Sequence, residues 1–153
     1  MAQIGSWKFI VQGCVGAKNN QFKEIAYVGP SRFIGAIKLV HRSGYVSCRF
    51  STVGSNWGCR ARGTSLAMVV TDAKNRTIYP SPRLVTVSSG GSYTLPGYTS
   101  SSPKLILTDF GNPKYIITNE KLRIWYGEDL KGSTESDNNG TTCMDIYAYF
   151  IFI

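Results

Sequence analysis

The sequence is short of several residue patterns, and each shortage excludes a class of protein. It has one histidine, His41, and its four cysteines include no Cys-x-x-C pair, which argues against a zinc site. Its longest apolar run, "IYAYFIFI" (146–153), is well below the roughly 20 residues that a membrane helix needs. There is no Gly-x-Ser-x-Gly motif or phosphate-binding loop, and one histidine offers little for a catalytic pair. We therefore expect no enzymatic activity.

Negative charge is also scarce, with nine Asp and Glu against seventeen Lys and Arg and a net charge of +8. Such a balance can indicate a nucleic-acid or anionic-membrane partner. The basic residues are scattered from Lys8 to Lys131, with no run denser than "CRAR" (59–62), although folding could still assemble a basic patch. We expect a solvated basic surface, no nucleic-acid partner and no membrane insertion.

The most abundant residue types favour β-structure. Sixteen glycines and nine tyrosines, with many Ser and Thr, are typical of strands joined by turns. Short stretches alternate apolar and polar residues, and none has the periodicity of an amphipathic helix. The predicted strands are 7–12, 22–28, 33–41, 45–51, 65–72, 84–88, 92–98, 104–109, 114–118, 120–126 and 142–152. So many strands in 153 residues predict an all-β fold, a two-sheet, jelly-roll-like β-sandwich forming a single domain over residues 1–153.

The four cysteines, Cys14, Cys48, Cys59 and Cys143, are widely spaced and allow three disulfide pairings. We favour Cys48 with Cys59, because "CRFSTVGSNWGC" is typical of two strand ends around a turn. Buried free thiols in a cytosolic protein are the alternative. Two Asn-x-Thr sequons, at Asn75 and Asn139, are compatible with secretion.

Five of the nine carboxylates fall within residues 125–145. They are Glu128, Asp129, Glu135, Asp137 and Asp145. "LRIWY" (122–126) leads into this polar segment and "TTCMDIYAYFIF" (141–152) leaves it, so we expect the tip of a hairpin made by the last two strands.

The segment "EDLKGSTESDNNG" (128–140) has the donors that calcium prefers, namely carboxylates, amides and backbone carbonyls. Crowded carboxylates repel one another unless a cation compensates them. Gly132 and Gly140 allow the turns that would bring carbonyls inward. The spacing is not that of an EF-hand, but the composition predicts a Ca²⁺ site.

The order of residues here resembles the calcium and galactose loop of the small galactophilic bacterial lectins. Tyr126-Gly-Glu-Asp129 leads through "LKGSTES" to Asp137-Asn138-Asn139-Gly140. The resemblance implies calcium ligands at Asp129, Asp137 and Asn138, with a backbone carbonyl near Thr134. Glu128 and Glu135 are additional carboxylates that this family's pattern lacks, and we include both as candidate ligands.

A second resemblance covers the whole domain. "IGAIKLVHRSGYVSCRFS" (34–51) followed by "GCR" (58–60), and "LRIWYGEDL" (122–130) with "ESDNNGTTCMDIYAY" (135–149), are similar to sea-anemone and coral proteins. That group includes a calcium-dependent, galactose-specific anemone lectin. The resemblance implies an extracellular, secreted protein with disulfides.

Together these observations predict a calcium-dependent lectin for galactose-terminated glycans such as lactose. The cis 3- and 4-hydroxyls of galactose would reach the calcium while the apolar face of the ring rests on an aromatic side chain. We expect Trp57 to form that wall, with Tyr126 or Trp125 as second choices and His41 at the rim. Asp129, Asp137 and Asn138 would contact both ion and sugar. We expect a homodimer, because single sugar sites are weak.

Two other functions are compatible with the sequence. A basic, membrane-active cytolysin would cluster Trp and Tyr beside Lys and Arg and need no metal. A structural matrix protein would bind calcium without any sugar.

Overall fold

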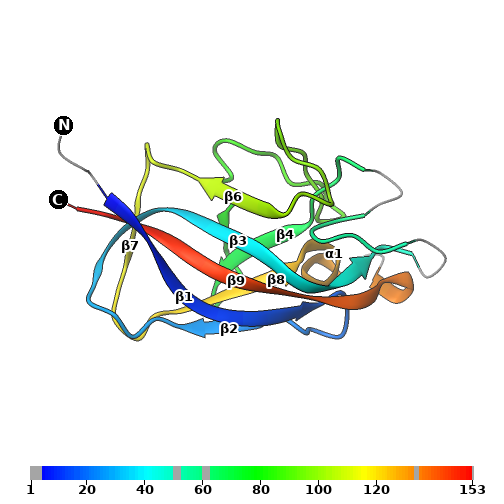
Figure 1. Ribbon diagram of the computed structural model, residues 1–153, viewed down its shortest axis with the longest axis horizontal. Helices are drawn as coiled ribbons and strands as arrows, with labels where there is room; N and C mark the ends of the chain where they lie inside the picture. Colours follow the sequence, from blue (N-terminus) through cyan, green and yellow to red (C-terminus); the bar gives the residue numbers. More distant parts are fainter. Residues whose placement is uncertain (1–4, 50–52, 60–62, 133–134, 153) are drawn as a thin grey trace.

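The computed structural model describes residues 5–49, 53–59, 63–132 and 135–152. Two antiparallel sheets pack on either side of one apolar core, which confirms the predicted all-β two-sheet sandwich in a single domain (Figure 1). In chain order the elements are β1 (Gly5–Gly16), β2 (Lys23–Ala26), β3 (Arg32–Ser47), β4 (Met68–Asp72), β5 (Thr77–Tyr79), β6 (Lys104–Thr108), β7 (Lys114–Ile116), β8 (Lys121–Tyr126), α1 (Gly127–Lys131), η1 (Glu135–Asp137) and β9 (Asn139–Ile151).

The first sheet has the order β1-β9-β3-β6, with β7 also paired to β3, and the second has the order β2-β8-β4-β5. Strand β9 lies inside the first sheet, between β1 and the long strand β3. Its side chains alternate, with Met144, Ile146, Ala148 and Phe150 buried in the core. The intervening residues lie on the outer face of this sheet and are partly exposed.

The polar segment does not form the predicted hairpin tip. β8 pairs with β2 and β4 in the second sheet, whereas β9 pairs with β1 and β3 in the first. The segment therefore crosses from one sheet to the other, and it contains the short helices α1 and η1. The hairpin prediction was wrong because adjacent strands in a sandwich can belong to different sheets.

Strand boundaries differ most where the backbone departs from ideal geometry. The predicted strand 33–41 and the first three residues of the predicted strand 45–51 belong to one strand, β3, because the expected turn is a bulge between His41 and Ser43. Residues 50 and 51 lie outside the described residues. Gly44 has a φ of 74°, and a Cβ there would collide with the carbonyl oxygen of Thr141.

Three other segments differ from the predicted strands. Residues 84–88 form no strand, and 92–98 contribute only a bridge between Tyr93 and Leu66. The short strand β5 was not predicted.

Both disulfides lie within the described residues. The predicted Cys48–Cys59 bond is confirmed, and it closes the loop that follows β3. Cys14–Cys143 joins β1 to β9 at positions that face each other across the ladder. No cysteine is free, so the alternative of buried thiols is excluded.

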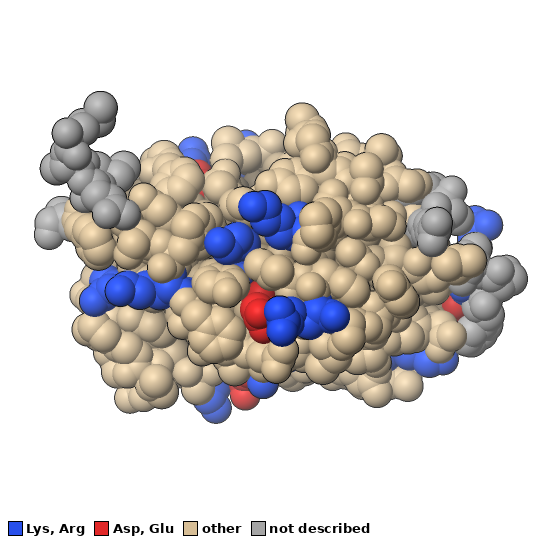
Figure 2. Space-filling model, viewed as in Figure 1, with Lys and Arg blue, Asp and Glu red and all other residues tan. Residues whose placement is uncertain are grey.

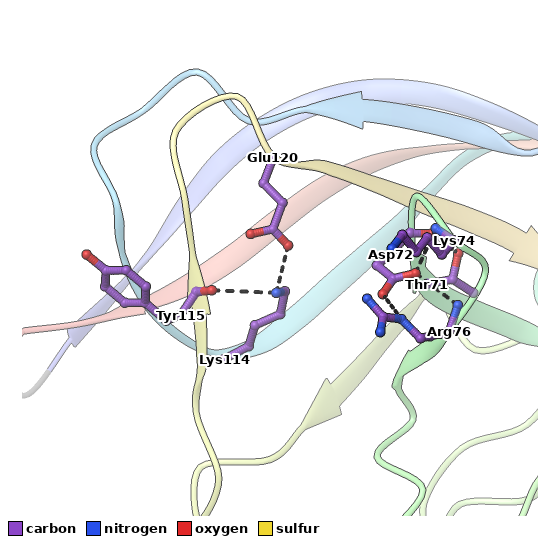
Figure 3. Close-up of polar contacts among 7 residues, drawn as sticks. All are labelled: Thr71, Asp72, Lys74, Arg76, Lys114, Tyr115 and Glu120. Carbon is purple, nitrogen blue, oxygen red and sulfur yellow. Dashed lines mark hydrogen bonds and ion pairs between the residues drawn. The ribbon is translucent and has the colours of Figure 1, made fainter.

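The turn between β4 and β5 is organised by one carboxylate (Figure 3). Asp72 Oδ1 accepts from the backbone N–H groups of Lys74 and Arg76, and its Oδ2 accepts from Arg76 Nε. Burial acts to raise the pKa of Asp72, but the hydrogen bonds from Arg76 and Lys74 and the Arg76 charge outweigh it, so the pKa lies below its usual value.

We expect Asp72→Asn to lower the free energy of unfolding at neutral pH by about 1–2 kcal/mol, because the neutral amide oxygen is a weaker acceptor and the amide nitrogen cannot accept the bond from Arg76 Nε. The folded-state pKa is depressed, so the wild-type advantage is present above the unfolded pKa and is lost as pH falls through the folded one. Urea unfolding of both proteins over a pH series measures this. A difference that stays constant down to acid pH would contradict it.

Candidate functional site

The polar segment begins directly after β8. The N–H of Gly127 donates to the carbonyl of Ala67, and a Cβ at Gly127 would collide with the backbone of Gly91. Helix α1 is capped by the next residue, Gly132, which has a φ of 73° and donates its N–H to the carbonyl of Glu128 at 2.7 Å. Gly127 therefore allows the close approach of the start of this helix to Gly91, and Gly132 supplies the left-handed residue that ends it.

Asp129 lies on the side of α1 that faces the turn between β1 and β2. Its side chain is buried, and its carboxylate accepts from the backbone N–H of Asn20 at 3.1 Å and of Gln21 at 3.2 Å. Asn19 and Asn20 both have positive φ, so this turn presents N–H groups that strand pairing cannot satisfy. Asp129 supplies the missing acceptor.

Asn138 binds the same turn from the other end of the polar segment. It has no exposed surface, and its Nδ2 donates to the carbonyl of Ala17 at 2.8 Å. Its Oδ1 is buried and has no hydrogen-bond partner among the described residues. A buried acceptor of this kind is uncommon and is the expected partner of an ion or a water.

The structure thus brings two of the predicted ligands, Asp129 and Asn138, to one turn, and it uses both to hold peptide groups. Asp137 precedes Asn138 and is partly buried in η1. Thr134 lies outside the described residues, and Glu135 is described only by its backbone at the start of η1.

Glu128 faces a different neighbourhood. It lines a small cavity of about 20 Å³ together with Tyr126 and the Cys48–Cys59 disulfide. Consecutive residues of a helix point about 100° apart, which separates Glu128 from its neighbour Asp129. Glu128 is therefore separated from Asp129 and Asn138, the two predicted ligands that meet at the turn after β1.

The oxygen donors of this segment suit calcium chemically. In the described part of the chain, however, no three His, Cys, Asp or Glu side chains are grouped so that they could hold a metal ion. The donors that fit best are the buried Oδ1 of Asn138 and the adjacent Asp137, because the Asp129 carboxylate already accepts two peptide bonds.

The predicted aromatic wall is corrected. Trp57 is 0% exposed and its indole N–H donates to the carbonyl of Ser102 at 2.6 Å, so it cannot stack on a sugar. Tyr126 is equally buried and donates its hydroxyl to the carbonyl of Gly58, and Trp125 is also in the interior. All three aromatic rings support the fold.

Sequence reasoning missed Tyr45, which is 59% exposed. Its ring stacks on His41 at 5.6 Å, and His41 in turn meets the edge of Trp57 at 5.9 Å. His41 is partly exposed and donates from Nε2 to the carbonyl of Gly44. Tyr45 pairs with Thr141 on β9, three residues after Asn138. Its exposure depends on the bulge in β3, so no simple alternation rule distinguishes it from the buried tyrosines.

No protein-family model and no curated protein sequence matches the chain. Among solved structures, AJLec from the sea anemone Anthopleura japonica superposes with a TM-score of 0.87. The two sequences are 33% identical, and the match covers 97% of this chain and 99% of AJLec. The chain belongs to the family of this sea-anemone lectin. The anemone part of the sequence resemblance is thereby confirmed, whereas the bacterial-type loop and calcium dependence stay predictions.

Membership in a lectin family agrees with the expectation of a binding protein without catalysis, and the two disulfides are typical of an extracellular one. None of the helices in the described ranges has the length and apolar character to cross a bilayer. On the face shown in Figure 2, Lys and Arg side chains form separate small groups and not one continuous basic patch.

We expect Asp129→Ala to lower the free energy of unfolding by about 1–2 kcal/mol in the presence of a chelator, because the N–H groups of Asn20 and Gln21 lose their acceptor. Asp137→Ala is the matched control and should change it by less than about 0.5 kcal/mol. Urea unfolding monitored by tryptophan fluorescence makes the comparison. Equal effects of the two substitutions would show that Asp129 does not anchor the turn.

Proposed function

We propose that this protein is a secreted, calcium-dependent lectin that binds terminal galactose without catalysis. The observation that carries the proposal is the family relationship with a sea-anemone lectin over 97% of the chain. The concentration of oxygen donors between β8 and β9 supports calcium as the cofactor.

Different residues of the polar segment make different contacts, and the proposal gives them different roles. Asp129 fixes the turn after β1, while Asn138 binds the same turn through Nδ2 and keeps Oδ1 for the ion. Asp137 adds a carboxylate at the adjacent position, and Glu128, Thr134 and Glu135 are the remaining candidates. Bound calcium would coordinate two vicinal hydroxyls of galactose in place of water.

Tyr45 is the aromatic side chain that supports recognition of the sugar ring. Its exposed ring offers the apolar surface that the C–H face of galactose requires, and His41 stacks against it and limits its motion. Tyr45 pairs with Thr141 at the end of β9 that follows the polar segment, so one sugar could contact the Tyr45 ring and an ion bound to that segment. This replaces the role first given to Trp57.

Partners and location follow from the same proposal. Galactose-terminated glycans are extracellular ligands, and the two disulfides suit that compartment. A homodimer would raise the apparent affinity for clustered glycans, because a single site binds weakly.

Calorimetry with galactose, in calcium and in chelator, tests the proposal. We expect binding only with calcium, and at least about tenfold weaker binding for Tyr45→Ala and Asp137→Ala. Tyr115→Ala is the matched control, since Tyr115 is also exposed but lies on β7, beside the opposite end of β3. It should bind as wild type does.

The other outcomes separate the alternatives. Unchanged galactose binding in chelator would overturn calcium dependence. Calcium binding with no response to galactose or lactose would favour the matrix protein, and red-cell lysis that persists in chelator would favour the cytolysin. Equal affinity of the Tyr45 and Tyr115 variants would overturn the role of Tyr45.

A further inference from the structure

A second cavity is lined by residues of β1, of the connection from β2 to β3 and of the end of β9. These segments lie at the end of the sandwich that carries β7, away from the polar segment (Figure 1). The volume of the cavity is about 330 Å³, and it opens between β1 and the connection from β2 to β3. The residues that decide its chemistry are Lys8, Phe9, Tyr27, Val28, Arg32 and Phe150.

The floor of this cavity is closed and aromatic. Tyr27 and Phe150 stack with ring centroids 5.7 Å apart, and the guanidinium of Arg32 lies 5.0 Å from the centroid of Phe150. The Tyr27 hydroxyl donates to the carbonyl of Pro30 at 2.6 Å. Behind this floor the core leaves a space of only about 10 Å³, too small for part of a ligand. A bound molecule must therefore keep its bulk outside the core.

The rim is apolar and open to solvent. Phe9 is 55% exposed and Val28 is 80% exposed, although both are large apolar side chains. Such side chains beside a cavity provide a surface for the apolar part of a ligand.

The cavity also carries two cations without a counter-charge. Lys8 and Arg32 line it, no carboxylate does, and neither cation takes part in an ion pair among the described residues. The nearby Lys114, by contrast, pairs with Glu120 at 2.7 Å (Figure 3). Among the described residues at this end of the sandwich, the two cations without an ion-pair partner are thus the ones that line the cavity, while Lys114 outside it has one.

We propose that this cavity binds the anionic head of an amphiphile, with a phosphate or carboxylate between Lys8 and Arg32 and the apolar body along Phe9 and Val28. The planar guanidinium of Arg32 suits a phosphate or carboxylate, and Lys8 adds a second positive charge. Because the floor is closed, an alkyl chain stays at the protein surface. Both a lipid headgroup in a bilayer and a soluble amphiphile have this chemistry.

The site is independent of the proposed galactose site. Arg32 begins β3, whereas Tyr45 lies near its other end, so both ligands could be bound together. Failure of one proposal therefore leaves the other standing.

The test uses Lys8→Gln/Arg32→Gln and a control of equal charge, Lys74→Gln/Lys104→Gln, whose side chains are exposed elsewhere. Binding is measured to vesicles of phosphatidylcholine with and without phosphatidylserine, and to dodecyl phosphate below its micellar concentration. We expect wild type and control to bind phosphatidylserine vesicles, dodecyl phosphate or both. The cavity variant should bind about tenfold less tightly or worse.

The two probes distinguish the source of the ligand. Binding to vesicles alone indicates a membrane lipid, and binding to dodecyl phosphate alone indicates a soluble amphiphile. Equal losses in both double variants, or no binding by wild type to either probe, would overturn the proposal. The single variant Lys8→Gln replaces the double variant if thermal unfolding shows that loss of Arg32 impairs folding, and galactose binding should be unchanged in each.

Discussion

Strand β9 is hydrogen-bonded along both of its edges, and the rest of the structure depends on this pairing. Its register with β1 runs from Gly5 and Ile151 to Gly16 and Thr141, and its register with β3 ends at Ser47 and Asn139. The Cys14–Cys143 disulfide fixes the same ladder covalently. A strand held on both edges cannot slide without moving every inward side chain to the outer face. The position of the polar segment that ends at Asn138 is therefore set by the sheet.

This constraint explains why the polar segment has two roles. Because β8 belongs to the other sheet, the chain must cross the sandwich between Tyr126 and Asn139. It does so over the turn after β1, where Asp129 and Asn138 supply an acceptor and a donor to peptide groups. At least one carboxylate of the polar segment, that of Asp129, thus stabilises the fold. The proposed site consists of the donors not used in this way, together with Tyr45 on the neighbouring strand.

The sequence predicted the sandwich and the Cys48–Cys59 bond, because alternation, turn residues and cysteine spacing are local signals. It did not predict which sheet each strand joins, since β8 and β9 are adjacent in the chain but pair with distant partners. The prediction that Trp57 stacks on the sugar was wrong for a related reason. Trp57 lies among loop residues, yet its carbonyl and indole partners come from Ala67 and Ser102 and hold it in the core. Tyr45 is exposed because of a bulge that no composition rule marks.

Amide NMR of the wild-type protein, titrated first with calcium and then with galactose, tests the central claim most directly, namely that one segment both anchors the fold and binds the ligand. Calcium should shift the amides of residues 135–138, and galactose should then shift those near Tyr45. Hydrogen exchange at Asn20 and Gln21 should stay slow throughout, because Asp129 remains bonded to them. Loss of that protection on adding calcium, or no shift between residues 127 and 141, would contradict the account.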